Sequence, residues 1–131
     1  MLGVTALSGC AAEQHATRCP FPGQEPLAIA ELFFGRNVPG RGPVTEAEWA
    51  DFATGVIAQE FPDGFTVLDG EGQFLDQASN RIIREPSKIL IAAADPESDL
   101  KSRIGAVVDA YRARFHQRSV GVVTSMACAA F

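Results

Sequence analysis

The sequence predicts an α+β domain in which two helices cover one face of a four-stranded antiparallel sheet. Three observations predict this fold. Four segments have the apolar alternation or the apolar run of strands, two have apolar residues at helical spacing, and their order is strand, helix, strand, strand, helix, strand. That order is typical of the ferredoxin-like βαββαβ arrangement, whose sheet has the strand order 4-1-3-2.

The first half of the domain is predicted as a strand over residues 27–36 and a helix over residues 45–61. Side chains alternate between the two faces of the strand. A loop rich in glycine and proline separates the two elements, and Thr45 forms a capping box with Glu48 at the start of the helix. Residues 62–64, Pro-Asp-Gly, end the helix.

The second half is predicted as two strands, a helix and a last strand, with the strands over residues 65–75, 81–94 and 119–131. Asp95 is the predicted N-cap of the helix, and Pro96 is its first residue. Pro86 cannot donate a hydrogen bond to a neighbouring strand, so we expect a bulge or a local break at this position.

The composition predicts one globular domain without general affinity for nucleic acids. The chain has 131 residues, of which 47% are hydrophobic, and its 16 acidic and 11 basic residues give a net charge of −5. A protein that binds nucleic acids generally needs a basic surface. No apolar run approaches the roughly 18 residues of a membrane span.

The sequence contains no recognisable catalytic or metal-binding motif. His15 and His116 lack the spacing of a metal-binding pair. No nucleophile elbow, phosphate-binding loop or dinucleotide-binding fingerprint occurs. We therefore predict no catalytic residue, no metal and no cofactor.

The N-terminus predicts attachment to the bacterial cell envelope. A short apolar stretch leads into Leu-Ser-Gly-Cys at residues 7–10, which resembles a lipobox, in which the cysteine receives lipid. No Lys or Arg precedes the stretch, so we interpret residues 1–10 as a remnant of a signal sequence. The alternative is an ordinary apolar tail with a chance cysteine. Residues 11–26 are predicted as a tether and residues 27–131 as the single domain, which is periplasmic or anchored to the membrane only through lipidated Cys10.

The cysteines indicate an oxidising compartment. If Cys10 carries lipid, Cys19 and Cys128 remain as a disulfide pair. The predicted topology favours this pairing, because the last strand ends beside the start of the first strand, close to the tether that holds Cys19. Two unpaired buried thiols are the alternative.

One end of the predicted sheet gathers the residues of a candidate binding site. Arg36 and Asn37 leave the first strand beside the segment that contains Glu85 and Lys88. Cationic and amide groups bind anions, and a carboxylate accepts or orients their hydrogen bonds, so we predict that these four residues bind a small anion. Four further arginines are expected at the same end: Arg41, Arg84, Arg114 and Arg118. Alternatively, Arg36 pairs with Glu85 and only stabilises the fold.

The second face of the predicted sheet has no helix over it and is fairly apolar. A sheet with one uncovered apolar face commonly pairs with a copy of itself. We therefore expect a homodimer through this open face.

Several segments of the domain resemble one bacterial family. In chain order they are ELFFGRNVPGRGPVTEAEWADF, FPDGFTVLDGEGQF, RIIREPSKILI and RFHQRSVGVVTSMACAAF. In these segments, which span about residues 27–131, the chain is similar to the family catalogued as domain of unknown function 3574. The resemblance implies a small secreted or lipid-anchored bacterial protein, and it implies no activity.

Together these features predict a non-catalytic domain of a bacterial envelope lipoprotein that binds a small anion or an envelope protein. The alternative is an enzyme of the oxygenase or isomerase type, cofactor-free or haem-dependent, because ferredoxin-like folds also carry such activities.

Overall fold

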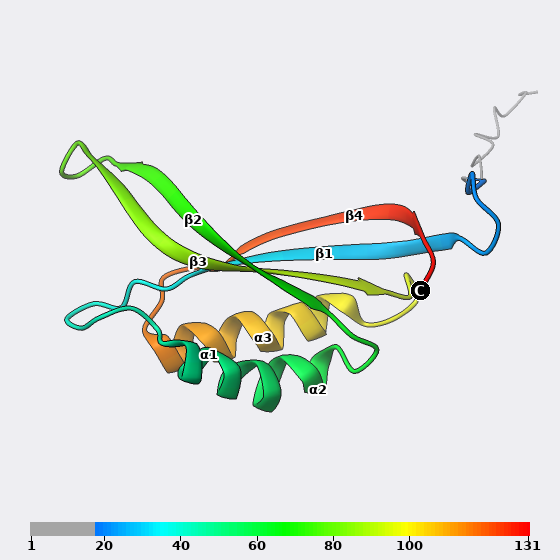
Figure 1. Ribbon diagram of the computed structural model, residues 1–131, viewed down its shortest axis with the longest axis horizontal. Helices are drawn as coiled ribbons and strands as arrows, with labels where there is room; N and C mark the ends of the chain where they lie inside the picture. The colour runs from blue at the N-terminus through cyan, green and yellow to red at the C-terminus, as the bar shows by residue number, and fades with distance from the viewer. Residues whose placement is uncertain (1–17) are drawn as a thin grey trace, which may run out of the picture.

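Four strands form one sheet, and the helices lie on one side of it (Figure 1). The computed structural model describes residues 18–131. Its strands are β1 (Glu25–Gly35), β2 (Thr66–Asp76), β3 (Arg81–Ala94) and β4 (Gly121–Ala129). Neighbouring strands are antiparallel and their spatial order is β2-β3-β1-β4. The predicted α+β fold and the strand order 4-1-3-2 are therefore confirmed.

The N-terminal predictions concern a part of the chain that lies outside the described residues. This part includes the lipobox-like segment with Cys10 and the tether up to residue 17. The first strand begins at Glu25, slightly before the predicted domain boundary at Leu27. Within residues 18–131, no helix combines the length and the apolar character that crossing a membrane requires.

The first helical segment differs from the single helix predicted over residues 45–61. It consists of α1 (Glu46–Phe52), a π-helical turn η1 (Ala53–Ile57) and α2 (Ala58–Glu60). The predicted capping box is present: Thr45 Oγ1 accepts a hydrogen bond from the Glu48 amide at 3.2 Å, and the Glu48 carboxylate accepts one from the Thr45 amide at 2.9 Å. Phe52 and Ile57 are both fully buried, and the wider π turn brings them to the same face.

The second helix, α3 (Leu100–Phe115), begins later than predicted. Its N-cap is Asp99, whose side chain accepts a hydrogen bond from the Ser102 amide at 3.2 Å. Asp95 instead forms a separate turn, in which its side chain accepts from the Glu97 amide at 2.7 Å. Aspartate before proline is typical of turns as well as of helix starts, and here the turn forms.

Pro86 lies in an uninterrupted part of β3, so the expected bulge is not formed. The register of β3 with β2 runs continuously from Arg81 to Ile91. The Pro86 carbonyl accepts a hydrogen bond from the Arg36 amide at 2.9 Å, on the β1 side. The N–H and C=O groups of one residue in an antiparallel strand point to the same neighbour. The missing N–H therefore faces the end of β1, and the pairing with β2 loses no bond.

A cluster of aromatic rings fills the space between the sheet and the helices. Its five members are buried: Phe34, Trp49, Phe52, Tyr111 and Phe115. The ring of Phe34 packs edge-to-face against Trp49 and Tyr111, with centroid distances of 5.2 and 4.8 Å. The Tyr111 hydroxyl also donates to the Gly35 carbonyl at 2.8 Å. The cluster thus fixes the end of β1 against the helices.

The predicted disulfide joins Cys19 and Cys128, whose Cα atoms are 5.5 Å apart. Cys128 lies on β4 opposite Pro26, so the bond ties the segment before β1 to the last strand. The two cysteines are separated by 109 residues along the chain. In the chain-entropy model, a loop of this length stabilises a fold by about 4–5 kcal/mol, although measured values are often smaller.

Replacing Cys128 by serine is expected to lower the free energy of unfolding by about 2–4 kcal/mol, because the unfolded chain gains the freedom that the closed loop removes. Urea denaturation followed by Trp49 fluorescence measures this change. The control is the wild-type protein in the presence of a reductant, which should unfold like the variant. Equal stability of the oxidised wild type and the variant would contradict this prediction.

Candidate functional site

The four residues of the predicted binding site lie on two sides of the sheet. Lys88 and Glu85 are three positions apart on β3, and side chains alternate along a strand, so the two point to opposite faces. Lys88 faces the helices, and Glu85 lies on the open face. Arg36 turns toward the helix side, whereas the backbone N–H of Asn37 contacts Glu85. The four residues therefore belong to two separate clusters in the structure and not to the single site that the sequence predicted.

The first cluster joins Arg36 and Lys88 through Glu46 of α1. Arg36 Nη1 donates to Glu46 Oε1 and Lys88 Nζ donates to Glu46 Oε2, each at 2.7 Å. Arg36 Nε also donates to the Val44 carbonyl at 2.7 Å, and Lys88 forms a second ion pair with Asp69. Protein acceptors therefore already engage both cations.

These contacts set the protonation states of the cluster. The hydrogen bond from Lys88 holds the pKa of Glu46 below its ordinary value, and Arg36 acts in the same direction. Lys88 likewise lowers the pKa of Asp69. Burial opposes the charge of Lys88, but its hydrogen bonds to Asp69 and Glu46 outweigh burial and raise its pKa. The cluster is thus a closed network of ion pairs, which leaves little capacity for an added anion.

The remaining arginines expected at this end do not converge with Arg36. Arg41 pairs with Glu48 at 3.0 Å, and Arg84 donates to a glutamine side chain at 2.7 Å. The guanidinium of Arg114 lies over the ring of its neighbour, 5.3 Å from the centroid. Arg118 lines the cavity that contains the second cluster.

The second cluster lines a cavity of about 910 Å³ on the open face, near the end of β1. The floor of this cavity has four glycines on the open face: Gly35, Gly70, Gly72 and Gly121. Ser87 lies between Gly35 and Gly70 of the two neighbouring strands. Glu85 lies opposite Gly72. Glycine within a strand often marks a place where another molecule approaches the backbone closely, and here it creates the depression.

The carboxylate of Glu85 depends on glycine at position 35. A Cβ atom there would lie 2.7 Å from Glu85 Oε1, well inside van der Waals contact. The backbone N–H of Asn37 donates to Glu85 Oε2 at the long distance of 3.4 Å. Among residues 18–131, no cationic side chain forms an ion pair with Glu85. Glu85 is therefore a half-buried carboxylate that can still accept hydrogen bonds within the cavity.

Apolar side chains surround this polar floor. They come from three strands and are Phe33, Phe74, Ile83 and Ile89. The rim is formed by residues 116–119 after α3, and the Gln117 side chain holds it in place by donating to the Asn37 carbonyl at 2.7 Å. The cavity can therefore take an apolar or aromatic group and present the Glu85 carboxylate and the Ser87 hydroxyl to it. In the described part of the chain, no three His, Cys, Asp or Glu residues are grouped as metal ligands.

Glu85 and Asn37 were predicted as site residues from the sequence, whereas the glycines and Ser87 were not. Gly70 and Gly72 could have indicated the site, because glycines inside a strand weaken it and often mark a place where a ligand approaches the backbone. Gly121 carries no comparable signal, since it stands at the start of a strand. Its place in the floor depends on its pairing with Phe33.

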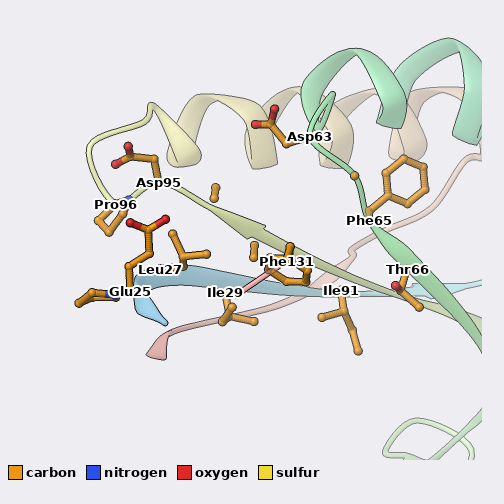
Figure 2. A pocket seen from close by; sticks show the side chains of 14 residues that line it. Glu25, Leu27, Ile29, Asp63, Phe65, Thr66, Ile91, Asp95, Pro96 and Phe131 are labelled. Atoms are coloured by element: carbon orange, nitrogen blue, oxygen red, sulfur yellow. The ribbon is translucent and has the colours of Figure 1, made fainter. Parts of the chain in front are cut away.

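A second cavity, of about 610 Å³, lies at the other end of the sheet, where β1 begins (Figure 2). Figure 2 shows the carboxylates of Glu25, Asp63 and Asp95 around it, together with apolar side chains such as Ile29 and Ile91. None of the three acids forms an ion pair within residues 18–131. All three are exposed, so the cavity lacks a polar group held in place by burial. The glycine-floored cavity is therefore the better candidate site.

Comparison with known proteins identifies a family and a set of similar folds. The family described as "Protein of unknown function (DUF3574)" matches residues 29–131, which confirms the resemblance seen in the sequence. No curated protein matches the chain.

Among solved structures, a phage SAM lyase in complex with S-methyl-5′-thioadenosine matches with a TM-score of 0.59 and 20% identity, over 80% of this chain and 90% of that chain. The apo state of a phage SAM lyase gives a TM-score of 0.59 and 22% identity, over 79% and 82% of the two chains. CutA from Synechococcus elongatus gives a TM-score of 0.51 and 10% identity, over 79% and 78%. At these identities the likeness shows the fold alone.

The variant Glu46→Gln is expected to be less stable than the wild type near neutral pH and to approach it in acid. The folded-state pKa of Glu46 lies below the unfolded-state value, so its ion pairs stabilise the fold above the ordinary carboxyl range of about pH 4–5. This stabilisation is lost as the pH falls through the folded-state pKa. Urea denaturation at a series of pH values measures the difference.

The matched control is Glu97→Gln, which removes an exposed carboxylate that forms no ion pair within the described residues. It should change the stability little at any of these pH values. A difference between wild type and Glu46→Gln that stays constant from neutral to acidic pH would rule out the ion pairs as its cause.

Proposed function

This chain belongs to the family of proteins of unknown function DUF3574, and we propose that it is a bacterial cell-envelope domain that binds a small organic molecule in its glycine-floored cavity. The observation that carries this proposal is the position of Glu85. Its half-buried carboxylate has no cationic partner among residues 18–131, and it lies on a floor from which side chains are missing.

The ligand that suits this cavity carries a positive charge or hydrogen-bond donors next to an apolar or aromatic group. A positive charge would complement Glu85, and the rings of Phe33 and Phe74 would attract it further through their π faces. The anion expected from the sequence is less well supported, because Arg36 and Lys88 already bind Glu46. An acidic group on the ligand would compete with Asp76 for Arg118, since both residues line this cavity and their charges attract.

A cofactor-free enzyme is the second candidate function. One observation favours it: the carboxylate of Glu85 lies in a cavity next to Ser87, where it is placed to accept a proton from a bound molecule. The fold is also shared with a phage SAM lyase, which is an analogy of architecture only.

The envelope location rests on the disulfide and on the N-terminal sequence. A disulfide persists in the oxidising environment outside the cytosol, and the Cys19–Cys128 bond agrees with such a location. The Leu-Ser-Gly-Cys segment at residues 7–10 would supply the lipid anchor at Cys10.

Binding can be tested by a thermal-shift screen of organic cations and their neutral analogues. SAM and S-methyl-5′-thioadenosine are included as two related compounds, of which the second lacks both the sulfonium charge and the aminocarboxypropyl group. We expect cations to bind. Glu85→Gln should weaken their binding about ten- to a hundredfold in calorimetry, because a hydrogen bond to a charged group contributes about 1.5–3 kcal/mol. The binding affinity for neutral analogues should fall much less in this variant.

Two further variants sharpen this test. Gly72→Val adds a side chain beside Glu85, and its Cβ would lie at an ordinary 3.6 Å from Glu85 Cγ, so it should block binding without distorting the strand. Glu25→Gln removes a carboxylate at the opposite end of the sheet and should leave binding unchanged. The proposal fails if no compound binds, or if Glu85→Gln and Gly72→Val bind cations like the wild type.

The envelope assignment predicts a lipid on Cys10. Intact-mass analysis of the protein from the membrane fraction of a bacterial host is expected to show a diacylated or triacylated N-terminal cysteine. The variant Cys10→Ser should lose this mass and leave the membrane fraction. An N-terminus that retains residues 1–9 and carries no lipid would refute the assignment.

A further inference from the structure

The open face of the sheet is apolar over most of its extent. Residues opposite one another in antiparallel strands share a face, so the pairing defines its apolar side chains: Leu27, Ile29, Phe33, Leu68, Phe74, Ile83, Ile89, Ile91 and Val123. Four of them are substantially exposed: Phe33 by 39%, Leu68 by 49%, Phe74 by 51% and Val123 by 48%. Several exposed apolar side chains on one face are typical of an interaction site.

The size of this face matches that of a stable protein interface. With about 3.3 Å per residue and about 4.8 Å between strands, the 11 residues of β1 and the four strands span roughly 36 by 19 Å, or about 700 Å². Contact between two such faces would bury roughly 1,400 Å². Stable specific interfaces bury about 1,200–2,000 Å² in total.

The β2–β3 hairpin would also be stabilised by contact with another layer. It extends past the end of β1, since β1 pairs with β3 only as far as Ser87 (Figure 1). Beyond this point the hairpin has two strands and exposes Phe74 on the open face, and Leu75 and Ile82 on the opposite face. A two-stranded ribbon is only marginally stable in water by itself, so contact with another layer would stabilise it.

We propose that another copy of this chain packs on the open face. A sheet with helices on one side gains a complete second core when a layer of equal size covers its other side. A second open face supplies such a layer with matching area and matching apolar character. Both cavities lie largely on this face, so the second copy also covers the mouth of the glycine-floored cavity.

Glu31 limits the strength of this association. It lies near the middle of β1 on the open face, between Ile91 and Val123 of the neighbouring strands, and it forms no ion pair within residues 18–131. Enclosing a carboxylate in an apolar interface is unfavourable unless it is paired. Removing its charge should therefore tighten the contact between copies.

The test is sedimentation equilibrium of the full chain without added ligand, with two matched pairs of variants. Val123→Asp and Val122→Asp are adjacent on β4 and similarly exposed, at 48% and 43%, but only Val123 lies on the open face. Leu68→Asp and Leu75→Asp form the same kind of pair on β2, at 49% and 44%, with Leu68 on the open face. Each pair therefore separates the effect of the face from the effect of an added charge.

We expect the wild type to have at least twice the mass of one chain at micromolar concentrations. Val123→Asp and Leu68→Asp should weaken the association at least tenfold, whereas Val122→Asp and Leu75→Asp retain it. Glu31→Gln should strengthen it severalfold.

A monomeric wild type at these concentrations would overturn the inference. Equal weakening of the association by the two variants of each pair would also overturn it. The same holds if only Val122→Asp and Leu75→Asp dissociate the assembly. Since no ligand is present, this result is independent of whether the cavity binds one.

Discussion

The burial of Phe34 determines how the polar residues of this domain are distributed. Its ring packs edge-to-face against Trp49 and Tyr111, which fixes the side of β1 that points to the helices. Alternation then places Gly35 on the open side and returns Arg36 to the helix side, where Glu46 accepts its hydrogen bond. A shift of one residue would exchange these two sides, and the aromatic cluster prevents it.

The two sides of the sheet use their charges differently. On the helix side, Lys88 is almost completely buried, and a buried cation is tolerated only with partners, which Glu46 and Asp69 provide. On the open side, Glu85 and Ser87 lie among four glycines, although glycine within a strand costs about 0.5–1 kcal/mol relative to alanine. Neighbouring side chains lie over three of these glycines: Glu85 over Gly35, Ser87 and Ile89 over Gly70, and Phe33 over Gly121, where an added Cβ atom would meet them at 2.7–3.2 Å. Glycine therefore lets these side chains lie close to the sheet, which shapes the cavity around Glu85 and Ser87.

The open face connects the candidate site with the rest of the surface. The glycine-floored cavity is a depression in a larger apolar face, so whatever covers that face also changes the access of water to Glu85. A carboxylate acts more strongly on a bound charge when water is excluded. The proposed binding of a small molecule and the proposed contact with another copy would therefore be physically linked at this surface.

The order of the elements, the extent of β3 and the capping box at Thr45 could be predicted from the sequence, because apolar periodicity and local hydrogen bonds are encoded over short stretches. The pairing of Cys19 with Cys128 was favoured over two unpaired thiols only because the predicted sheet topology places these distant residues close together. The N-cap was misplaced at Asp95, where a turn competes with the helix. Alternation could also have separated Glu85 from Lys88. Contacts between distant parts of the chain alone show that Glu46 binds both Arg36 and Lys88, and that glycines from three strands lie near Glu85. Which acceptor a long cationic side chain reaches depends on residues that are far apart in the chain. The grouping of glycines in one patch of the sheet likewise depends on how distant strands pair.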